Sequence, residues 1–308
     1  MKLVIISQMP EDCTRKAIRC FPDDWDVSFA APGRLPAAAA NADAIIPEHI
    51  EINGEMLDAM PSLKIIQTGA GYDNIDLNAC RIRGITVCNA AGVNADAVAE
   101  HVLAFIFCHY KNMCLLNSAM KSGFKTIPEY CGGEISGKTV GIIGLGAVGQ
   151  AVAKRCLALG MHVLGTTRNP KETEGIVLVN RDELLSQSDI VTVHASLQDD
   201  SRHMMNRETF SKMKPDALFI NTSRGALVDE ADLIEALQQG RIGGACLDVF
   251  EEEPLAADSP LRGLHNVILT PHTAGYPDGV HFHERRYAFF ARNIEAKMKG
   301  EKPQNIIV

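Results

Sequence analysis

The segment TVGIIGLGAVG, residues 139–149, decides the fold of this chain. An apolar, β-branched run enters three glycines spaced G-x-G-x-x-G, and residues 148–159 then show a helical pattern without proline. A strand that turns through glycines into a helix is typical of dinucleotide-binding domains, because the helix N-terminus offers free N–H groups to an anion. We therefore predict that this turn binds a pyrophosphate through Gly144, Gly146, Ala147, Val148 and Gly149.

Short β-branched runs alternate with helical patterns on both sides of this segment. Strands are expected at residues 2–7, 26–31, 42–47, 64–69 and 85–90, and a second series at 139–144, 161–167, 189–195, 217–223, 244–250 and 266–272. Helices are expected between the early strands of the second series and again at 229–239. Two series of alternating strands and helices predict two α/β domains, each doubly wound around a parallel sheet.

Residues 95–120 form a long apolar stretch with too few helix breakers to be anything but a helix. It is apolar on most faces, so we expect it to be buried against another domain or another subunit. The chain is expected to cross between domains near 95–104 and again near 275–290, where a helix from 283 to 300 returns to the first domain.

Composition excludes several classes of protein. The chain has 308 residues, of which 46% are hydrophobic and 22% charged, and its net charge is −8, which disfavours a nucleic-acid binder. No stretch is long enough to span a membrane, and the opening residues resemble a strand rather than a signal sequence. The nine cysteines contain no C-x-x-C pair, so we expect reduced thiols in a cytoplasmic protein and neither a disulfide framework nor a metal site.

The strand at residues 161–167 ends unusually. In dinucleotide-binding domains this position usually carries an acid that hydrogen-bonds the ribose 2′-hydroxyl, but here Thr167 and Arg168 follow. An acid would repel the 2′-phosphate of NADP, whereas a guanidinium can donate two hydrogen bonds to phosphate oxygens. The sequence therefore predicts a preference for NADP(H), with NAD(H) as a possible second cofactor.

Six ordered motifs make the chain resemble the D-isomer-specific 2-hydroxyacid dehydrogenase family. They are GAGYDNID (69–76), GVNADAVAEH (92–101), GLGAVG (144–149), MKPDALFINTSRGALVDE (213–230), GACLDVFEEEP (244–254) and LTPHTAG (269–275). The resemblance implies a Rossmann cofactor domain, residues 100–284, inserted into a flavodoxin-like substrate domain, residues 1–99 and 285–308. It also implies a homodimer joined through the cofactor domains.

The resemblance places a catalytic set at Arg224, Glu253 and His272. A 2-oxo acid presents a carboxylate and a carbonyl, which a planar guanidinium can hold together. His272 is expected to donate a proton to the carbonyl oxygen as hydride arrives at carbon, or to remove one in the reverse direction. Glu253 is expected to hydrogen-bond His272, select its tautomer and favour its protonated form.

Further site residues also follow from the resemblance. The backbone N–H groups of Ala70 and Gly71 are expected to bind the substrate carboxylate, with Arg224 and His272, and His49 is a weaker candidate for the same role. Positions expected to contact the cofactor ribose or nicotinamide are His194, Ser196, Thr222, Ser223, Asp248 and Gly275. Ala91 and Ser196 depart from the family pattern, because proline is common at both positions.

Alternatives within the family can be weighed from single residues. Formate dehydrogenases carry glutamine at the position of Glu253, and phosphite dehydrogenases carry lysine at the position of Ala70. Long phosphoglycerate dehydrogenases have added regulatory domains, for which this chain is expected to have no room. These comparisons favour a glyoxylate or hydroxypyruvate type of reductase for a small 2-oxo acid. The alternative from another class is a dinucleotide-sensing corepressor that binds partners without physiological turnover.

Overall fold

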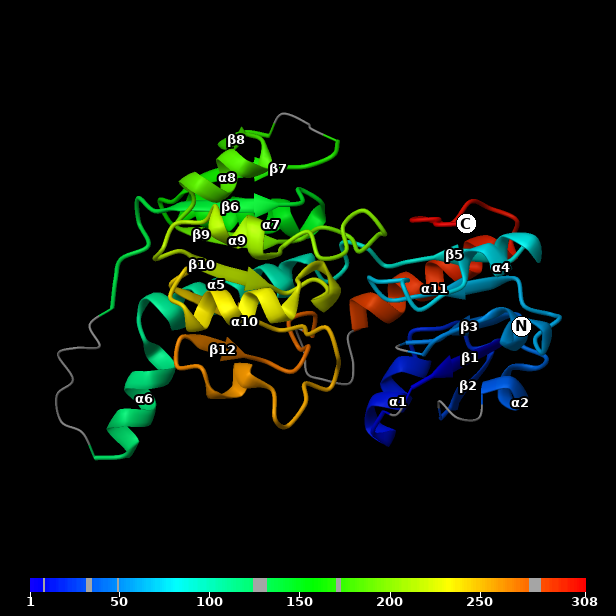
Figure 1. The fold of residues 1–308 in the computed structure, drawn as a ribbon. Helices are drawn as coiled ribbons and strands as arrows, with labels where there is room; N and C mark the ends of the chain where they lie inside the picture. Colours follow the sequence, from blue (N-terminus) through cyan, green and yellow to red (C-terminus); the bar gives the residue numbers. More distant parts are fainter. Residues whose placement is uncertain (8, 32–34, 49, 124–131, 170–172, 277–283) are drawn as a thin grey trace. The chain divides into compact units, whose positions relative to one another are not determined.

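The computed structural model describes the chain except residues 8, 32–34, 49, 124–131, 170–172 and 277–283. The chain divides into two compact units, one of residues Met1–Asn94 with Tyr276–Val308 and one of residues Ala95–Gly275. Each unit contains a parallel β-sheet with helices packed on it (Figure 1), so the predicted α/β fold class is confirmed.

The first unit has a five-stranded sheet in the order β2-β1-β3-β4-β5, and every pair of neighbouring strands is parallel. Its strands are β1 (Lys2–Ile6), β2 (Asp26–Ala30), β3 (Ala44–Ile46), β4 (Ile65–Gln67) and β5 (Thr86–Cys88). Its helices are α1 (Glu11–Ile18), α2 (Leu35–Ala39), α3 (Gly54–Asp58), α4 (Leu77–Ile82) and α11 (Glu284–Met298). This strand order is that of flavodoxin-like sheets, whose ligand site lies where the order reverses between β1 and β3.

Both faces of this sheet are covered, which explains its nearly continuous apolar strands. Successive side chains of a strand point to opposite faces. Val4 therefore packs in a cluster with Leu57 of α3, whereas Ile5 packs in another cluster with Phe290 of α11. Residues from the two ends of the described unit thus share one core.

The second unit has a seven-stranded parallel sheet in the order β12-β11-β10-β9-β6-β7-β8. Its strands are β6 (Thr139–Ile143), β7 (His162–Thr166), β8 (Ile176–Leu178), β9 (Ile190–Val193), β10 (Leu218–Asn221), β11 (Gly244–Leu247) and β12 (Val267–Leu269). Its helices are α5 (Ala95–Tyr110), α6 (Met113–Lys121), α7 (Ala147–Ala158), α8 (Arg181–Gln187), α9 (Arg207–Ser211) and α10 (Glu230–Gln238), with short 3₁₀ turns at Gly225–Leu227 and Pro260–Gly263.

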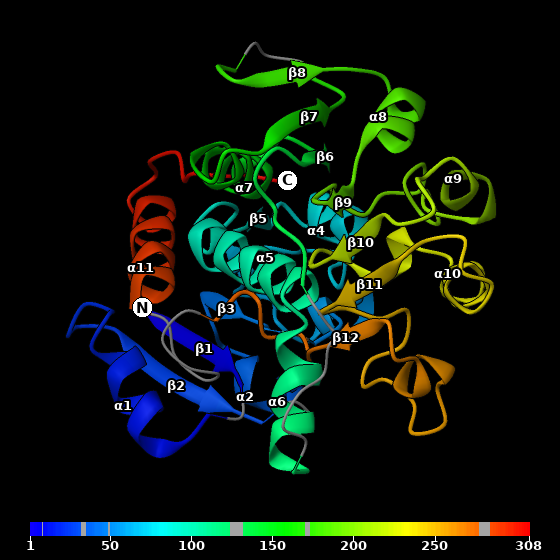
Figure 2. The same cartoon turned by 90° about the vertical axis from the view of Figure 1, so that its left-hand side faces the viewer.

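This second order is that of a Rossmann sheet, in which the strand order reverses between β6 and β9. The glycine-rich turn follows β6 and therefore lies at this switch point. Figure 2 shows α5 and α7 on one face of the sheet and α8, α9 and α10 on the other. The strands are buried between these helices and contribute to the core on both faces of the sheet, for example through Ile143 and Ile142.

The expectation of one helix over residues 95–120 is wrong. The chain forms α5, breaks at Lys111 and Asn112, and continues as α6. Asn112 adopts a left-handed conformation with φ of 49°, which asparagine tolerates better than most residues and which ends the regular helix. The first part is buried as expected through Val102 and Ile106, but none of the residues of α6 is buried in the described chain.

Two further details differ from the expectation. Strand β8 was not predicted, because it is only three residues long and lies at the sheet edge, where its middle residue Val177 is 59% exposed. The expected domain boundary after residue 99 falls inside α5. The observed division precedes α5, because that helix packs as one body against α7 through residues such as Val102 and Val152.

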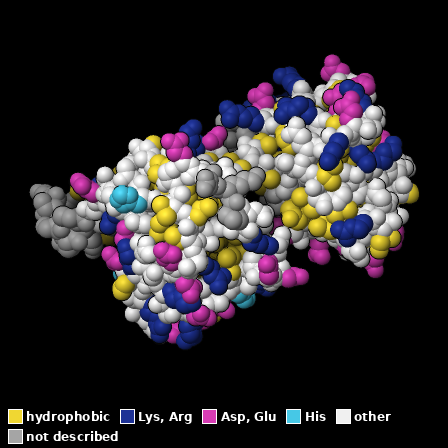
Figure 3. Space-filling model, turned by 90° about the horizontal axis from the view of Figure 1, so that it is seen from above, with side chains coloured by type: hydrophobic (Ala, Val, Ile, Leu, Met, Phe, Trp, Pro, Cys, Tyr) yellow, Lys and Arg dark blue, Asp and Glu magenta, His cyan; other side chains and the backbone are white. Residues whose placement is uncertain are grey.

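The remaining structural observations concern the surface charges, the cysteines and the length of the helices. On the face drawn in Figure 3, cationic and anionic side chains are interspersed. None of the cysteines in the described ranges forms a disulfide, and four of them, Cys80, Cys88, Cys156 and Cys246, are buried. Cys131 lies outside the described residues. No helix in those same ranges is both long enough and apolar enough to cross a membrane.

Candidate active site

The glycine-rich turn after β6 is shaped by close approaches of backbone. Gly144 has φ of 99°, a conformation that favours glycine, and a β-carbon there would stand 2.7 Å from the backbone N of Ala195. A β-carbon on Gly149 would stand 2.1 Å from the carbonyl oxygen of Gly144. Both positions therefore require glycine for the strand, turn and helix to pack together.

Gly146 differs from these two glycines, because a β-carbon there would meet no described atom within 4 Å. It caps α7, and no side chain of the described chain hydrogen-bonds the first N–H groups of that helix. Free N–H groups, a positive helix end and open space beside Gly146 suit a bound anion. The hydroxyl oxygen of Thr222 is also buried without a hydrogen-bond partner in the described part. The residues present therefore fit a dinucleotide.

The centre of the candidate site is a hydrogen bond between His272 and Glu253. Nδ1 of His272 lies 2.7 Å from Oε2 of Glu253, and the two side chains are 37% and 36% exposed. The other oxygen of Glu253 accepts a hydrogen bond from the backbone N–H of Phe250. Burial raises the pKa of Glu253, but the His272 hydrogen bond and charge, the Phe250 N–H and the Arg224 guanidinium outweigh it and lower that pKa below its usual value. The carboxylate is therefore ionised, and His272 donates from Nδ1.

The loop that carries His272 is held by Asp248, which directly follows β11. The Asp248 side chain is buried and accepts hydrogen bonds from the Thr270 hydroxyl at 2.5 Å and from the N–H groups of Thr273 and Ala274 at 2.8 and 2.9 Å. The backbone N–H of His272 also donates to the carbonyl of Asp248. His272 itself has φ of 54°, an uncommon conformation for a residue with a side chain. Asp248 therefore orders the loop on which His272 depends.

His101 of α5 joins this arrangement and was not singled out from the sequence. Its Nε2 lies 3.1 Å from Oγ1 of Thr270, and 3.9 Å from the Asp248 carboxylate. Because the Thr270 hydroxyl donates to Asp248, His101 must donate to Thr270 from Nε2. Burial lowers the pKa of His101, and the negative charge of Asp248 opposes that effect only in part. A neutral His101 thus supports the loop through a hydrogen bond rather than an ion pair.

Arg224 follows β10 in a turn organised by Asn221. The Asn221 side chain accepts hydrogen bonds from the N–H and the hydroxyl of Ser223 and donates one to the carbonyl of Arg224. A β-carbon on Gly225 would stand 1.8 Å from the carbonyl oxygen of Phe250, so this turn packs directly on the backbone just before Glu253. Asn221 could have been inferred from the sequence, because asparagine at a strand end often organises the following turn.

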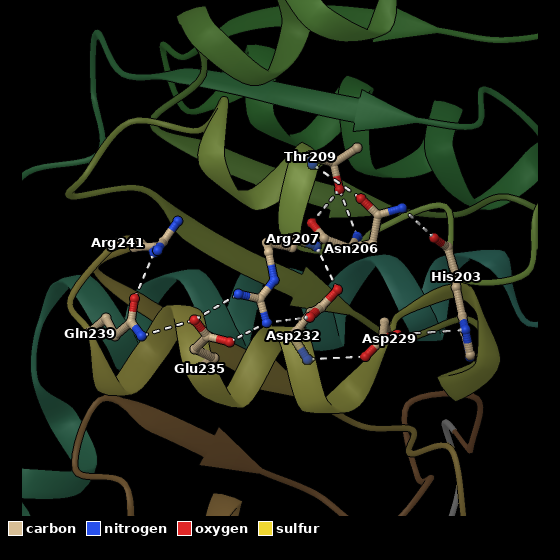
Figure 4. A network of polar contacts seen from close by, with 9 residues as sticks. All are labelled: His203, Asn206, Arg207, Thr209, Asp229, Asp232, Glu235, Gln239 and Arg241. Atoms are coloured by element: carbon tan, nitrogen blue, oxygen red, sulfur yellow. Dashed lines mark hydrogen bonds and ion pairs between the residues drawn. The ribbon is translucent and has the colours of Figure 1, made fainter.

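The segment after Arg224 is anchored by a polar network between α9 and α10 (Figure 4). Asn206 and Thr209 cap α9 reciprocally, and Asp229 caps α10. Arg207 forms ion pairs with Asp232 and Glu235 of α10. Surface ion pairs of this kind contribute little individually, but the caps fix where both helices begin. The turn that bears Arg224 is therefore attached to a well-defined helix pair.

Thr167 and Arg168 follow β7, at the same sheet edge as the glycine-rich turn. The Arg168 guanidinium lies 2.5 Å from the side-chain oxygen of Gln198 and 3.5 Å from a carboxylate oxygen of Asp200. Arg168 and Asp200 are 57% and 68% exposed, so their ion pair is weak and exchangeable.

The remaining predicted cofactor positions occupy varied surroundings. Burial lowers the pKa of His194 to about 4, and its ring hydrogen-bonds the hydroxyl of Thr192, so the ring is neutral near pH 7. Ser196 is exposed, and its carbonyl accepts a hydrogen bond from Ser201. Gly275 ends the His272 loop and the second unit.

Ala70 and Gly71 belong to the first unit, in the loop after β4. The buried Asn89 side chain donates to the carbonyl of Ala70 and accepts a hydrogen bond from the N–H of Ala91. Proline at position 91 would lack that N–H, so the departure of Ala91 from the family pattern adds a hydrogen bond that orders this loop. His49 lies outside the described residues.

Comparisons with known proteins identify the family of the chain. Residues 103–274 match the family model described as "D-isomer specific 2-hydroxyacid dehydrogenase, NAD binding domain". The chain is 36% identical to a glyoxylate reductase of Thermococcus litoralis, over 99% of this chain and 96% of that protein. It is 40% identical to a D-3-phosphoglycerate dehydrogenase of Archaeoglobus fulgidus, over 75% of this chain but only 45% of that longer protein.

One similar solved structure matches this chain over the full length of both chains. It is an acyclic imino acid reductase in complex with NADPH and D-Arg, with a TM-score of 0.88 and 33% identity. The fold and site thus define a nicotinamide dinucleotide-dependent oxidoreductase. The chain belongs to the D-isomer specific 2-hydroxyacid dehydrogenase family.

The two glycines of the turn should respond differently to substitution. Gly149→Ala forces a methyl group into the Gly144 carbonyl, and overpacking of this kind costs about 1–3 kcal/mol, so urea unfolding should begin at a lower concentration. Gly146→Ala meets no described atom and should unfold like the wild type. Its methyl group should nevertheless weaken dinucleotide binding measured by fluorescence. Equal stability of the two variants would contradict this assignment.

Proposed function

We propose that the chain reduces a small 2-oxo acid of the glyoxylate or hydroxypyruvate type to the D-2-hydroxy acid, with NADPH as the preferred reductant. The observation that carries this proposal is the hydrogen bond between His272 and an ionised Glu253, with the Arg224 turn packed on the backbone that leads to Glu253. The alternative of a corepressor-like binding protein is not favoured, since the relatives are named as reductases and dehydrogenases.

Each catalytic side chain has a role that follows from its chemistry. Arg224 orients the 2-oxo acid by donating to its carboxylate and carbonyl oxygens. The bound nicotinamide supplies the hydride for reduction or accepts it in the reverse direction. Ala70 and Gly71 bind the substrate carboxylate through their backbone N–H groups.

Proton transfer is assigned to Nε2 of His272. Glu253 occupies Nδ1, so a protonated imidazole presents Nε2–H to the substrate oxygen, and a neutral imidazole presents the Nε2 lone pair to the hydroxyl of the product. Because the pKa of Glu253 is lowered, its carboxylate stays ionised near neutral pH and keeps Nδ1 of His272 as the donor of this hydrogen bond.

The test of this function is oxidation of NADPH with a panel of 2-oxo acids. The panel should include a 2-oxo acid mixed with an amine, because a similar solved structure is an imino acid reductase. His272→Ala should reduce kcat on the order of 10²–10⁴-fold, the usual contribution of a positioned acid or base. If none of these substrates supports the oxidation of NADPH or NADH, the proposed function is wrong.

Glu253→Gln tests the acid–base pair separately. Glutamine can still accept a hydrogen bond from Nδ1 but lacks the negative charge that favours the imidazolium, so reduction should fall off at a lower pH than in the wild type. The nearby Glu252→Gln, which removes an exposed carboxylate, serves as the control. If both variants share the wild-type pH profile, Glu253 does not control the proton on His272.

The preference for NADPH is assigned to Thr167 and Arg168. The support is the lack of an acid at position 167 and the exposed, exchangeable partners of Arg168. A solved structure that covers the whole chain also contains NADPH. A 2′-phosphate would replace Gln198 and Asp200 as the partner of the guanidinium.

Cofactor affinity should follow this assignment. A charge-assisted hydrogen bond contributes roughly 1.5–3 kcal/mol, so Arg168→Ala should weaken NADPH binding by about 10- to 150-fold while NADH binding changes little. Thr167→Asp should reverse the preference, because it repels the phosphate and accepts a ribose hydrogen bond. Arg181→Ala, at an exposed position of α8, is the control for charge alone. Equal NADPH affinity in wild type and Arg168→Ala would show that Arg168 does not read the phosphate.

We also propose that the chain forms a homodimer whose interface covers α6. Met113, Leu115 and Met120 of this helix are 54%, 42% and 60% exposed, which is unusual for so apolar a helix. Sedimentation at micromolar concentration should give a dimer. Met120→Asp should shift it towards the monomer, because it places a charge in the covered surface. A wild-type monomer would contradict the proposal.

A further inference from the structure

The first unit contains a largely buried ion pair that the proposed catalytic set does not use. Glu48 follows β3, and its carboxylate forms an ion pair with Arg286 of α11 and accepts a hydrogen bond from the hydroxyl of Tyr287 at 3.1 Å. The side chains of Arg286 and Glu48 are only 16% and 12% exposed. Removing two charges from water is costly, so such a pair is maintained only where its geometry is good and further hydrogen bonds satisfy the charged groups.

The position of this pair in the fold is that of a ligand site. In an open parallel sheet, ligands bind outside the carboxyl ends of the strands where the strand order reverses, here between β1 and β3. Glu48 lies just beyond the end of β3, and Tyr287 also contacts the sulfur of Met9, which lies beyond the end of β1. Glu48 has φ of 25°, and such backbone strain is concentrated at functional sites.

Arg286 has an unused donor that faces no acceptor in the described chain. Its Nε is buried without a hydrogen-bond partner there, although Nη2 binds Glu48. The guanidinium also stacks over Phe290, with 5.2 Å from Cζ to the ring centroid. Burial lowers the pKa of Arg286, but Glu48 and the nearby tyrosines raise it above its ordinary value, so the group is permanently charged. A buried, charged donor without an acceptor is costly, and a ligand oxygen placed there would satisfy it.

Arg286 also lies beside the loop proposed to bind the substrate carboxylate. A β-carbon placed on Gly69 would stand 3.7 Å from Nη2 of Arg286, and Gly69 directly precedes Ala70 and Gly71. A 2-oxo acid held by that loop would bring the substituent on its third carbon within reach of the guanidinium.

The charge of the pair decides which substituent fits. Glu48 already neutralises Arg286, so a second anionic group on the substrate would meet the Glu48 carboxylate as well as the guanidinium. A neutral oxygen can accept the unused N–H without that repulsion.

We propose that Arg286 and Glu48 form a specificity subsite that accepts a neutral hydroxyl on the third carbon of the 2-oxo acid and disfavours an acidic group there. This inference rests on the proposed function, because it requires that a 2-oxo acid is the substrate. It selects 3-hydroxy-2-oxo acids, such as hydroxypyruvate, over analogues whose third carbon is an unsubstituted methyl group or bears a carboxylate.

The test compares kcat/KM for hydroxypyruvate, pyruvate and oxaloacetate, each divided by the value for glyoxylate, which has no third carbon. The wild type should favour hydroxypyruvate over pyruvate by about 10-fold or more, the value of a charge-assisted hydrogen bond. Arg286→Met should remove most of this preference. Glu48→Gln should raise the oxaloacetate ratio by about 10-fold, because it removes the repelling charge.

Controls separate this subsite from a structural role. Arg285→Met removes an exposed neighbouring charge and should leave all ratios as in the wild type. Arg286→Lys keeps the charge beside Glu48 but lacks Nε, so it should lower the hydroxypyruvate ratio even if Arg286→Met fails to fold. If the protein reduces these acids but Arg286→Lys and Glu48→Gln leave the ratios unchanged, the subsite is wrong and the proposed function is unaffected. Absence of turnover with every 2-oxo acid would instead overturn the proposed function, and the subsite with it.

Discussion

The buried carboxylate of Asp248 is the interaction on which the candidate active site depends. It accepts three hydrogen bonds from residues 270–274, and these bonds hold His272 in an uncommon left-handed conformation. A neutral acceptor at this position could not satisfy the same donors as strongly in a buried environment. The orientation of His272 towards Glu253 follows from this loop, and so does the acid–base chemistry that we propose.

The second constraint on the candidate active site comes from glycines, because the lack of a side chain lets the backbones of separate loops approach closely. Gly225 lets the Arg224 turn lie against the Phe250 carbonyl, and Gly149 lets α7 lie against the turn after β6. Any side chain at these positions would occupy space that backbone atoms already fill. Close packing of backbone thus places Arg224 near Glu253, and it places the N-terminus of α7 beside β6.

Much of the fold was predictable from local patterns. Parallel strands buried on both faces have short, continuous apolar runs, so β1 and β6 were readily located and the two-sheet α/β class was confirmed. The break at Asn112 escaped prediction, because apolar residues resume at Met113 and two polar residues alone do not specify the left-handed backbone that ends the helix. Strand β8 escaped prediction since an edge strand of three residues carries too little pattern.

The sequence alone determined the chemistry that we propose for the site, because residue types and ordered motifs specify a glycine-rich turn, an arginine, an acid and a histidine. It could not show that Asp248 and His101 support the histidine loop, or that Glu48 neutralises Arg286. Glu48 and Arg286 stand at opposite ends of the chain, and only the packing of α11 on the first sheet joins them. Charge neutralisation, burial and unused donors are properties of such contacts between distant residues, so only the tertiary structure decides them.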